Sequence, residues 1–255
     1  MSEFLFKYSG SKRHLLKHYR KPPRTCKRIV EPYLEGGAYA LNHDLPALGL
    51  DTNPYVVKLW HWLQRATKDD LERVERVLNE ARSKDPKVDI RALDLEEGAM
   101  LYLKINVCGL IVGQWSSWST YPQHSLPLKH TPEALEAARR VKVLLGDASL
   151  YVPQEGDMLF VDPPYASTSG NYGNEASYQP EHTRELIERA RAPTILTYGD
   201  GAPDIFPGLD WEAISIRRVP NMRRGGSVER TEFVTYINWP EEDTQMNVFD
   251  FFGET

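Results

Sequence analysis

The order of elements between residues 29 and 66 constrains the fold of this chain more than any other feature. A predicted strand at 29–33 enters the turn Gly36-Gly37, a short helix follows, and a second predicted strand at 47–50 ends at Asp51. A glycine turn after one strand, with an acid about 20 residues further on, is typical of the opening of an α/β nucleotide-binding fold. We therefore expect a Rossmann-like α/β sheet with Asp51 at its carboxyl edge.

A second apolar run, at residues 158–161, ends in Asp162-Pro163-Pro164-Tyr165. Asp162 can accept one N–H of a planar amino group, and the carbonyl group of Pro163 can accept the other. Both prolines have a fixed φ, so these two acceptors are held rigidly. Tyr165 can stack on the ring that carries the amino group. The pattern suits chemistry at the exocyclic nitrogen of a base, and the structural alternative is a strand that ends in a Pro-Pro turn.

The rest of the chain continues to alternate between helices and strands, with one interruption. Helices are expected at 69–83, 132–145 and 180–190, and strands at 194–198, 212–219 and 232–239. Residues 95–128 lose this alternation and are rich in Trp, Ser, Gly and Gln, which indicates an insertion. We predict one main domain formed by residues 1–66 and 131–240, an inserted lobe at 67–130, and an acidic tail at 241–255.

The composition excludes several classes of protein. No run approaches the ~20 apolar residues of a membrane span, and the first residues lack the basic and apolar regions of a signal peptide. A soluble, cytoplasmic protein is expected. The cysteines, Cys26 and Cys108, lie far apart, and the seven histidines show no metal-ligand spacing. We therefore expect neither a disulfide framework nor a metal site.

Charge is distributed unevenly along the chain, although the net charge is only −5. Residues 241–255 hold five acidic side chains and no Lys or Arg, whereas residues 1–30 hold nine basic side chains and one acidic side chain. This asymmetry predicts a local anion-binding surface near the N-terminus. A solvated basic helix face is the alternative.

With these features in view, residues 4–240 resemble the Dam-type (D12 class) DNA adenine N6-methyltransferases. The resemblance consists of motifs that follow one another in the family's order: Lys7-Tyr8-Ser9-Gly10-Ser11-Lys12, Glu31-Pro32-Tyr33 through Gly37, Asp51-Thr52-Asn53, Gly146-Asp147 and Asp162 to Tyr165. It implies a Rossmann-like S-adenosylmethionine-dependent methyltransferase sheet, with a small inserted target-recognition lobe at 67–130.

The resemblance also implies a role for each matching residue. The residues expected to bind S-adenosylmethionine are Tyr8, Lys12, Tyr33, Gly36, Gly37, Asp51 and Asp147. Among them, Asp51 would hold the ribose hydroxyl groups, Lys12 would lie near the amino-acid end, and Asp147 would lie at the edge of the cofactor's adenine. Asp162, Pro163, Pro164 and Tyr165 would hold a target adenine that has been flipped out of double-stranded DNA.

Two segments depart from the family pattern. Glu35 stands where the family has its first loop glycine, so either a residue with a side chain adopts that turn or the turn differs locally. Residues 106–118 differ from the stretch that the family uses for target recognition, so methylation at GATC is not implied.

Several residues outside the matching motifs are candidates for contacts with DNA. The candidates for phosphate contacts are Lys7, Arg13, Lys17, Arg223 and Arg224. Trp115 and Trp118 are candidates for stacking on bases, with packing inside the lobe as the alternative.

The acidic tail contains an apolar pattern of its own. Gln245, Val248, Phe251 and Phe252 have the spacing of peptides that bind replication sliding clamps. A tail that packs back on its own core is the alternative.

The same residues leave other functions open. An RNA adenine or the N4 amino group of cytosine in DNA would suit the same four residues at 162–165. A non-catalytic DNA-binding or clamp-binding module is a further alternative, to which the substitution at Glu35 lends the only support.

Overall fold

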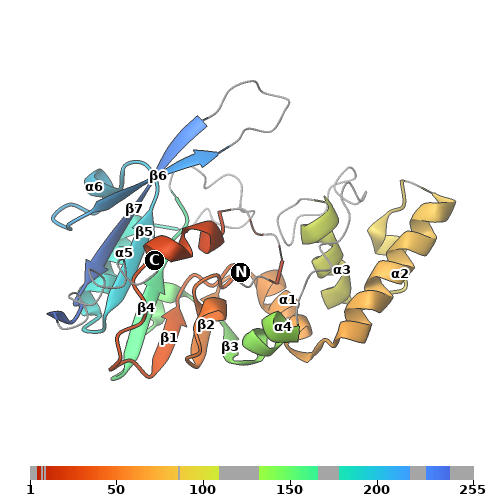
Figure 1. The fold of residues 1–255 in the computed structure, drawn as a ribbon, viewed down its shortest axis with the longest axis horizontal. Coiled ribbons are helices and arrows are strands. Elements are labelled where there is room, and N and C mark those ends of the chain that lie inside the picture. Colours follow the sequence, from red (N-terminus) through yellow and green to blue (C-terminus); the bar gives the residue numbers. More distant parts are fainter. Residues whose placement is uncertain are drawn as a thin grey trace, which may run out of the picture.

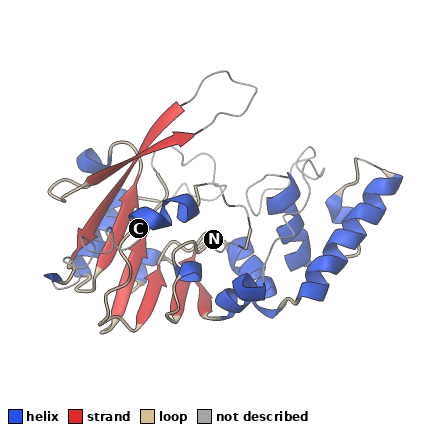
Figure 2. Cartoon of the chain, in the orientation of Figure 1, coloured by secondary structure: helices blue, strands red, loops and turns tan. Residues whose placement is uncertain are grey.

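A computed structural model describes residues 5–6, 8, 10–85, 87–108, 132–165, 178–218 and 228–241. These residues form a seven-stranded sheet with helices on both of its faces (Figures 1 and 2). No helix within the described part of the chain is long and apolar enough to cross a membrane.

The strands are arranged in the order β3-β2-β1-β4-β5-β7-β6. Their bounds are β1 Arg28–Glu31, β2 Ala47–Asp51, β3 Val141–Leu145, β4 Asp157–Val161, β5 Thr194–Tyr198, β6 Glu212–Arg218 and β7 Val228–Ile237. Neighbouring strands from β3 to β5 are parallel, whereas β7 runs antiparallel to both β5 and β6. This arrangement confirms the predicted α/β class, and β6 and β7 occupy the two segments predicted as the last strands.

Helices and shorter helical turns connect the strands. The α-helices are α1 Pro54–Arg65, α2 Lys68–Lys84, α3 Glu97–Leu103, α4 Pro132–Arg139, α5 Pro180–Arg189 and α6 Ala202–Ile205. The 3-10 turns are η1 Lys12–His18, η2 Ala40–Asn42, η3 Ile90–Ala92 and η6 Ala148–Leu150, and a π-helical turn, η4 Lys104–Cys108, continues α3.

Alternate residues of each central strand face different cores, as the two-residue period of a strand requires. Ile29 of β1 and Phe160 of β4 join one core with α1 to α4, whereas Val30 and Leu159 join a second core with α5 and α6. Because both faces are covered, the residues in the middle of these strands are buried and mostly apolar.

The prediction of a helix throughout 132–145 was wrong in its second half. The helix α4 ends at Arg139, and residues 141–145 form β3, which pairs in parallel with β2 at the edge of the sheet. Val141 and Val143 are buried, whereas Leu144 and Leu145 are exposed. β-branched residues such as these valines favour a strand. Because the two exposed residues are also apolar, the sequence of this strand does not show a regular alternation of apolar and polar residues.

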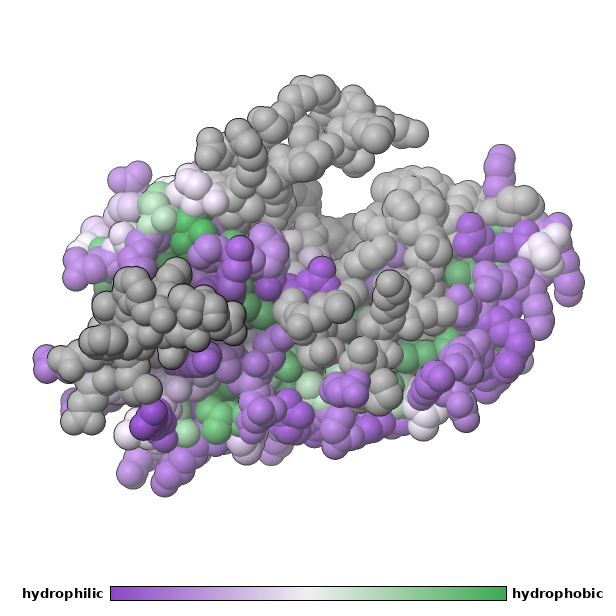
Figure 3. Space-filling model, viewed as in Figure 1, coloured by the Kyte–Doolittle hydropathy of each residue, from purple (hydrophilic) through white to green (hydrophobic). Residues whose placement is uncertain are grey.

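The helices α2 and α3 come from the segment predicted to be an inserted lobe. They lie beyond α1, with α2 furthest from the sheet (Figure 1). α2 begins with a capping box between Thr67 and Asp70, and its apolar stripe of Leu71, Val74 and Leu78 faces the core. Because the apolar residues of α2 face inward, the surface at this end of the molecule is mostly hydrophilic (Figure 3). The lobe boundaries at 67 and 130 stay a prediction.

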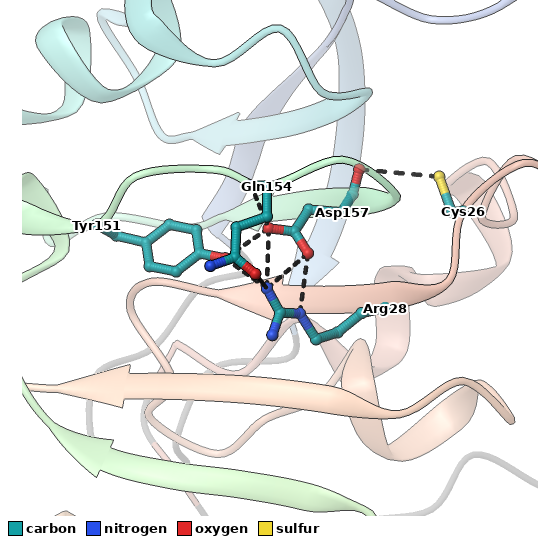
Figure 4. Close-up of polar contacts among 5 residues, drawn as sticks. All are labelled: Cys26, Arg28, Tyr151, Gln154 and Asp157. Carbon is teal, nitrogen blue, oxygen red and sulfur yellow. Dashed lines mark hydrogen bonds and ion pairs between the residues drawn. The ribbon is translucent and has the colours of Figure 1, made fainter.

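A buried ion pair holds β1 to β4 at the amino edge of the sheet (Figure 4). Arg28 Nε donates to Asp157 Oδ1 (2.8 Å) and its Nη2 donates to Oδ2 (3.1 Å). The Tyr151 hydroxyl group (2.5 Å) and the Gln154 backbone N–H (2.7 Å) also donate to Oδ2. Because Asp157 is only 2% exposed, these donors are needed to stabilise its charge.

Candidate functional site at the carboxyl edge of the sheet

The candidate site lies where the strand order reverses. β1 and β4 are neighbours in the sheet, while the chain continues from β1 to β2 on one side and from β4 to β5 on the other. Open α/β sheets bind ligands at such a switch point, outside the carboxyl ends of the strands. Glu31 and Asp51 end β1 and β2, and Asp162 follows β4, so the topology brings these carboxyl groups to one edge.

An open pocket lies at this edge, and its space, together with solvent at the open mouth, amounts to about 620 Å³. It is lined by Tyr8, Pro32, Tyr33, Glu35, Asp51, Thr52, Asp147, Ala148, Pro164, Tyr178 and His182. The predicted cofactor residues Tyr8, Tyr33, Asp51 and Asp147 therefore share one cavity with Pro164 of the tetrapeptide.

Asp51 is oriented by two backbone amides. Its Oδ2 accepts from the N–H of Glu35 (3.0 Å), and its Oδ1 accepts from the N–H of Asn53 (2.8 Å). Burial raises the pKa of Asp51 to about 6, although both amides oppose that rise. Each carboxylate oxygen has a second lone pair, so Asp51 can also accept hydrogen bonds from hydroxyl groups in the pocket.

The loop after β1 adopts the turn that its sequence made uncertain. Glu35 takes a left-handed conformation with φ of 44°, which confirms that a residue with a side chain occupies this position. Gly37 follows with φ of 58°, and a Cβ atom there would lie 2.6 Å from the Trp60 ring. Trp60 Nε1 donates to the carbonyl group of Glu35 (2.9 Å), so the indole ring restrains the loop both by this hydrogen bond and by its contact with Gly37.

Aromatic residues form one wall of the pocket. The Tyr33 hydroxyl group lies 2.8 Å from Thr183 Oγ1, and the Tyr178 hydroxyl group lies 3.1 Å from the same oxygen. The two tyrosine rings meet edge to face with centroids 6.1 Å apart. Burial raises the pKa of Tyr33 to about 12, so this wall stays neutral at physiological pH.

Asp162 is held by a lysine and a threonine from distant parts of the chain. Lys12 Nζ lies 2.7 Å from Asp162 Oδ1 and donates to Oδ2 at 2.9 Å. Thr197 Oγ1, from β5, donates to Oδ1 (2.8 Å). Burial by itself would lower the pKa of Lys12, but the nearby carboxylates of Asp162 and Glu232 raise the pKa above its ordinary value. Lys12 therefore stays a cation although it is only 4% exposed.

Tyr165 is anchored through both its hydroxyl group and its ring. The hydroxyl group donates to Glu232 Oε2 (2.6 Å). The ring lies close to Gly199, where a Cβ atom would approach within 2.8 Å, and its centroid is 4.8 Å from that of Tyr198. Burial and the charges of Asp162 and Glu232 raise the pKa of Tyr165, so its ring stays neutral.

Other predicted site residues occupy different places relative to the pocket. Lys12 does not line the pocket but contacts Asp162, so its proximity to a cofactor's amino-acid end stays a prediction. Gly36 packs near Tyr8, whose Cβ lies 3.3 Å from the Cβ position of residue 36. Pro163 is buried, whereas its neighbour Asp162 is only partly buried.

The predicted DNA contacts are only partly within the described residues. Arg13 and Lys17 lie on η1, where Lys17 is exposed and Arg13 is half-buried. The other residues predicted to contact DNA or a sliding clamp lie outside the described residues, namely Lys7, Trp115, Trp118, Arg223, Arg224, Gln245, Val248, Phe251 and Phe252.

Sequence reasoning missed several residues of this edge, namely Tyr178, His182, Thr183, Thr197 and Glu232. Glu232 offered one signal, because it is a charged residue inside an otherwise strand-like run. Among the described residues, no group of His, Cys, Asp and Glu side chains could hold a metal ion.

No protein-family model matches the chain. A DNA N-6-adenine-methyltransferase of Escherichia phage P1 is 25% identical over 228 residues, which cover 79% of this chain and 30% of that protein. The chain thus spans about a third of the length of this relative.

Solved methyltransferase structures are also similar to this chain. Precorrin-6y C5,15-methyltransferase from Geobacter metallireducens aligns with a TM-score of 0.38 and 8% identity, over 92% of this chain and 93% of that one. A dimethyladenosine transferase from Plasmodium falciparum aligns with a TM-score of 0.37 and 10% identity, over 96% and 66% of the two chains. The strand order of this chain, with helices on both faces of the sheet, is that of a Rossmann-like α/β fold.

Proposed function

We propose that this protein transfers a methyl group from S-adenosylmethionine to the N6 amino group of an adenine in double-stranded DNA. One observation carries the proposal: Asp162 and Tyr165, which suit an aromatic amine, adjoin a pocket that suits a nucleoside, and Pro164 belongs to both. The phage P1 relative, named as a DNA N-6-adenine-methyltransferase, supports the choice of adenine in DNA.

The residues of the pocket fit the cofactor. Asp51, held by the amides of Glu35 and Asn53, offers free lone pairs to ribose hydroxyl groups. Tyr33 offers an apolar ring, and Asp147 at the start of η6 offers a carboxylate to an adenine edge. When bound, S-adenosylmethionine supplies an electrophilic methyl group on a sulfonium centre.

The acceptor side relies on orientation. The amino nitrogen of adenine is a poor nucleophile, because its lone pair is delocalised into the ring. Asp162 accepts one N–H and the Pro163 carbonyl group accepts the other, which draws the lone pair toward the donor. Tyr165 stacks on the base after it has left the duplex. Catalysis then depends on positioning and electrostatics, without a covalent enzyme intermediate.

The DNA surface is proposed from charge. Lys7, Arg13 and Lys17 would contact phosphates near the N-terminus, and Arg223 and Arg224 would contact the same duplex. Trp115 and Trp118 would stack on bases within the lobe.

The tail is proposed to reach a sliding clamp through Gln245, Val248, Phe251 and Phe252. A pull-down with a clamp should recover the full chain more efficiently than a truncation after Trp239. Equal recovery of the two would remove this part of the proposal.

The activity is tested by incubating the protein with methyl-labelled S-adenosylmethionine and, separately, with double-stranded DNA and RNA. Digestion to nucleosides should yield labelled N6-methyldeoxyadenosine from the DNA. Label in cytidine or in RNA adenosine would assign a different acceptor. The absence of label from every nucleic acid would refute the proposal.

Asp162→Asn keeps the shape of the side chain but removes its charge. We expect this variant to lose about 10²- to 10³-fold in kcat while it still binds the cofactor. Asp204→Asn makes the same chemical change at an exposed position on α6, and should retain the activity of the parent.

A further inference from the structure

Thr183 is a polar residue on the buried face of α5. The buried residues of this helix are Thr183, Leu186 and Ile187, and their spacing of three and four places them on one face. Leu186 and Ile187 join the second core, and Thr183 is 0% exposed. A valine would fill the same space in this apolar stripe, so the buried hydroxyl group of Thr183 requires an explanation other than packing.

The hydroxyl group of Thr183 is hydrogen-bonded to two tyrosines of the pocket wall. Thr183 Oγ1 lies 2.8 Å from the Tyr33 hydroxyl group and 3.1 Å from the Tyr178 hydroxyl group. Because a threonine hydroxyl group has one proton and two lone pairs, it can bond both tyrosines at once. These two partners explain why a polar residue occupies this position of α5.

The two hydrogen bonds join segments that are far apart in the chain. Tyr33 belongs to the loop after β1, which also carries the Glu35 N–H that orients Asp51. Tyr178 lies just before the start of α5. Thr183 therefore connects the loop after β1 with the first turn of α5 at a single oxygen atom.

This connection restricts the orientation of both tyrosine rings. The ring centroids of Tyr33 and Tyr178 are 6.1 Å apart, and the ring planes meet at 84°. The backbone holds one end of each ring and Thr183 holds the hydroxyl group at the other end, so neither ring can tilt without breaking a hydrogen bond. Aromatic pairs also prefer an edge-to-face arrangement, so both kinds of contact favour the same geometry. A planar base that enters the pocket therefore meets rings that are oriented in advance.

The other residues of the pocket indicate which part of a ligand this wall meets. Asp51, which can accept hydrogen bonds from hydroxyl groups, lines the same pocket as Tyr33 and Tyr178. Flat apolar rings beside such a carboxylate suit a nucleoside, because the base can stack on a ring while the sugar hydroxyl groups donate to the acid. The described residues that line the pocket include no lysine or arginine that would attract the carboxylate group of an amino acid. We therefore expect the wall to meet the adenosine part of the cofactor.

We propose that Thr183 is a positioning residue of the cofactor pocket, which fixes the Tyr33 and Tyr178 rings in the orientation that binds the adenosine part of S-adenosylmethionine. This role rests on the cofactor of the proposed function. Thr183 is not among the residues that line the pocket, and it acts on the ligand through the two tyrosines.

Four variants test this role. Thr183→Val keeps the shape of the side chain but removes its hydroxyl group, whereas Thr183→Ser keeps the hydroxyl group. A double variant, Tyr33→Phe with Tyr178→Phe, keeps both rings but removes the two partners of Thr183. Thr194→Val is the matched control, because Thr194 is also 0% exposed and its hydroxyl group also makes a hydrogen bond, to the Ala192 carbonyl group (3.0 Å). Thr194 begins β5, so it lies at the opposite edge of the sheet from the pocket.

Calorimetry on the full chain measures the affinity for S-adenosylmethionine and S-adenosylhomocysteine, and displacement of the latter measures the affinity for adenosine. Thr183→Val should raise the Kd of all three ligands about tenfold, because they share the adenosine part. Thr183→Ser should recover most of the affinity, and Thr194→Val should bind like the parent. In the background of the double variant, Thr183→Val should change the Kd less than about twofold, because the hydroxyl groups through which it acts are already absent. Urea denaturation checks that each variant is folded.

The outcomes distinguish this inference from the proposed function. A Thr183→Val variant that binds the ligands like the parent would refute the role of Thr183, and so would an equal loss in the parent and double-variant backgrounds. An equal loss of affinity in Thr194→Val would show a general effect of stability, and would also refute it. If the parent binds neither S-adenosylmethionine nor adenosine, the inference and the proposed function are both refuted. If the expected pattern of binding is found but no nucleic acid is methylated, the proposed function is refuted while the role of Thr183 stands.

Discussion

Replacing Gly37 with alanine should damage both the stability of the protein and the cofactor pocket. Gly37 has φ of 58°, a conformation that costs an L-residue about 1–2 kcal/mol. Its added Cβ atom would also lie 2.6 and 2.8 Å from two carbons of the Trp60 ring. Trp60 is fully buried and is bonded to the Glu35 carbonyl group, so the ring cannot withdraw freely. Overpacking of this kind costs about 1–3 kcal/mol.

The two costs together predict that Gly37→Ala lowers the free energy of unfolding by about 2–5 kcal/mol. The same loop carries the Glu35 N–H that orients Asp51, so we expect cofactor affinity to fall at least about tenfold, which corresponds to the loss of one charge-assisted hydrogen bond. Urea denaturation measures the first effect. Isothermal titration with S-adenosylmethionine measures the second.

Gly208→Ala is the matched control, because Gly208 has φ of 83° and nothing lies within 4 Å of its Cβ position. It should show only the backbone cost, about 1 kcal/mol, with unchanged cofactor affinity. If the two variants lost the same stability and both bound cofactor like the parent, the clash with Trp60 would be irrelevant, and the reasoning would be wrong.

Further predictions concern the two edges of the sheet. Asp157→Ala leaves Arg28 without its buried partner and should cost about 3 kcal/mol in urea denaturation, without altering cofactor affinity at the opposite edge. Because burial raises the pKa of Asp51 to about 6, its carboxylate is present above that pH and is lost below it. Calorimetry between pH 8 and pH 5 should therefore show cofactor affinity falling through pH 6, and Asp51→Asn should flatten that profile. Thr197→Val removes one donor that orients Asp162 and should lower kcat about tenfold, whereas an unchanged kcat would show that Lys12 suffices.

The sequence alone was sufficient for the central part of the fold. The glycine pair between two apolar runs, with Asp51 after the second run, and the run that ends at Asp162 each identify a strand and its carboxyl end. Parallel strands end at a common edge, and the family resemblance carried by these patterns implied that Asp51 and the tetrapeptide take part in one reaction. The pocket that contains both Asp51 and Pro164 agrees with that expectation.

Local patterns failed where an element lacked a clear buried face. The run 141–145 was assigned to a helix, because Val141 and Leu145 suit a helical repeat as well as a strand. It is an edge strand whose last leucines are exposed, and only its pairing with β2 distinguishes the two possibilities. An edge strand is specified by its neighbour more than by its own alternation.

The acceptor side of the site was decided by the tertiary structure. Lys12 lies 150 positions before the aspartate that it bonds, and Glu232 lies 67 positions after the tyrosine that it anchors. A sequence indicates which residues of a helix or strand are buried. It does not indicate which helices and strands from distant parts of the chain lie next to one another. The antiparallel direction of β7 places Glu232 just beyond the carboxyl end of β5, and this direction follows from the packing of the whole sheet. The sequence therefore determined the chemistry at residues 162–165, and the tertiary structure determined which charges surround it.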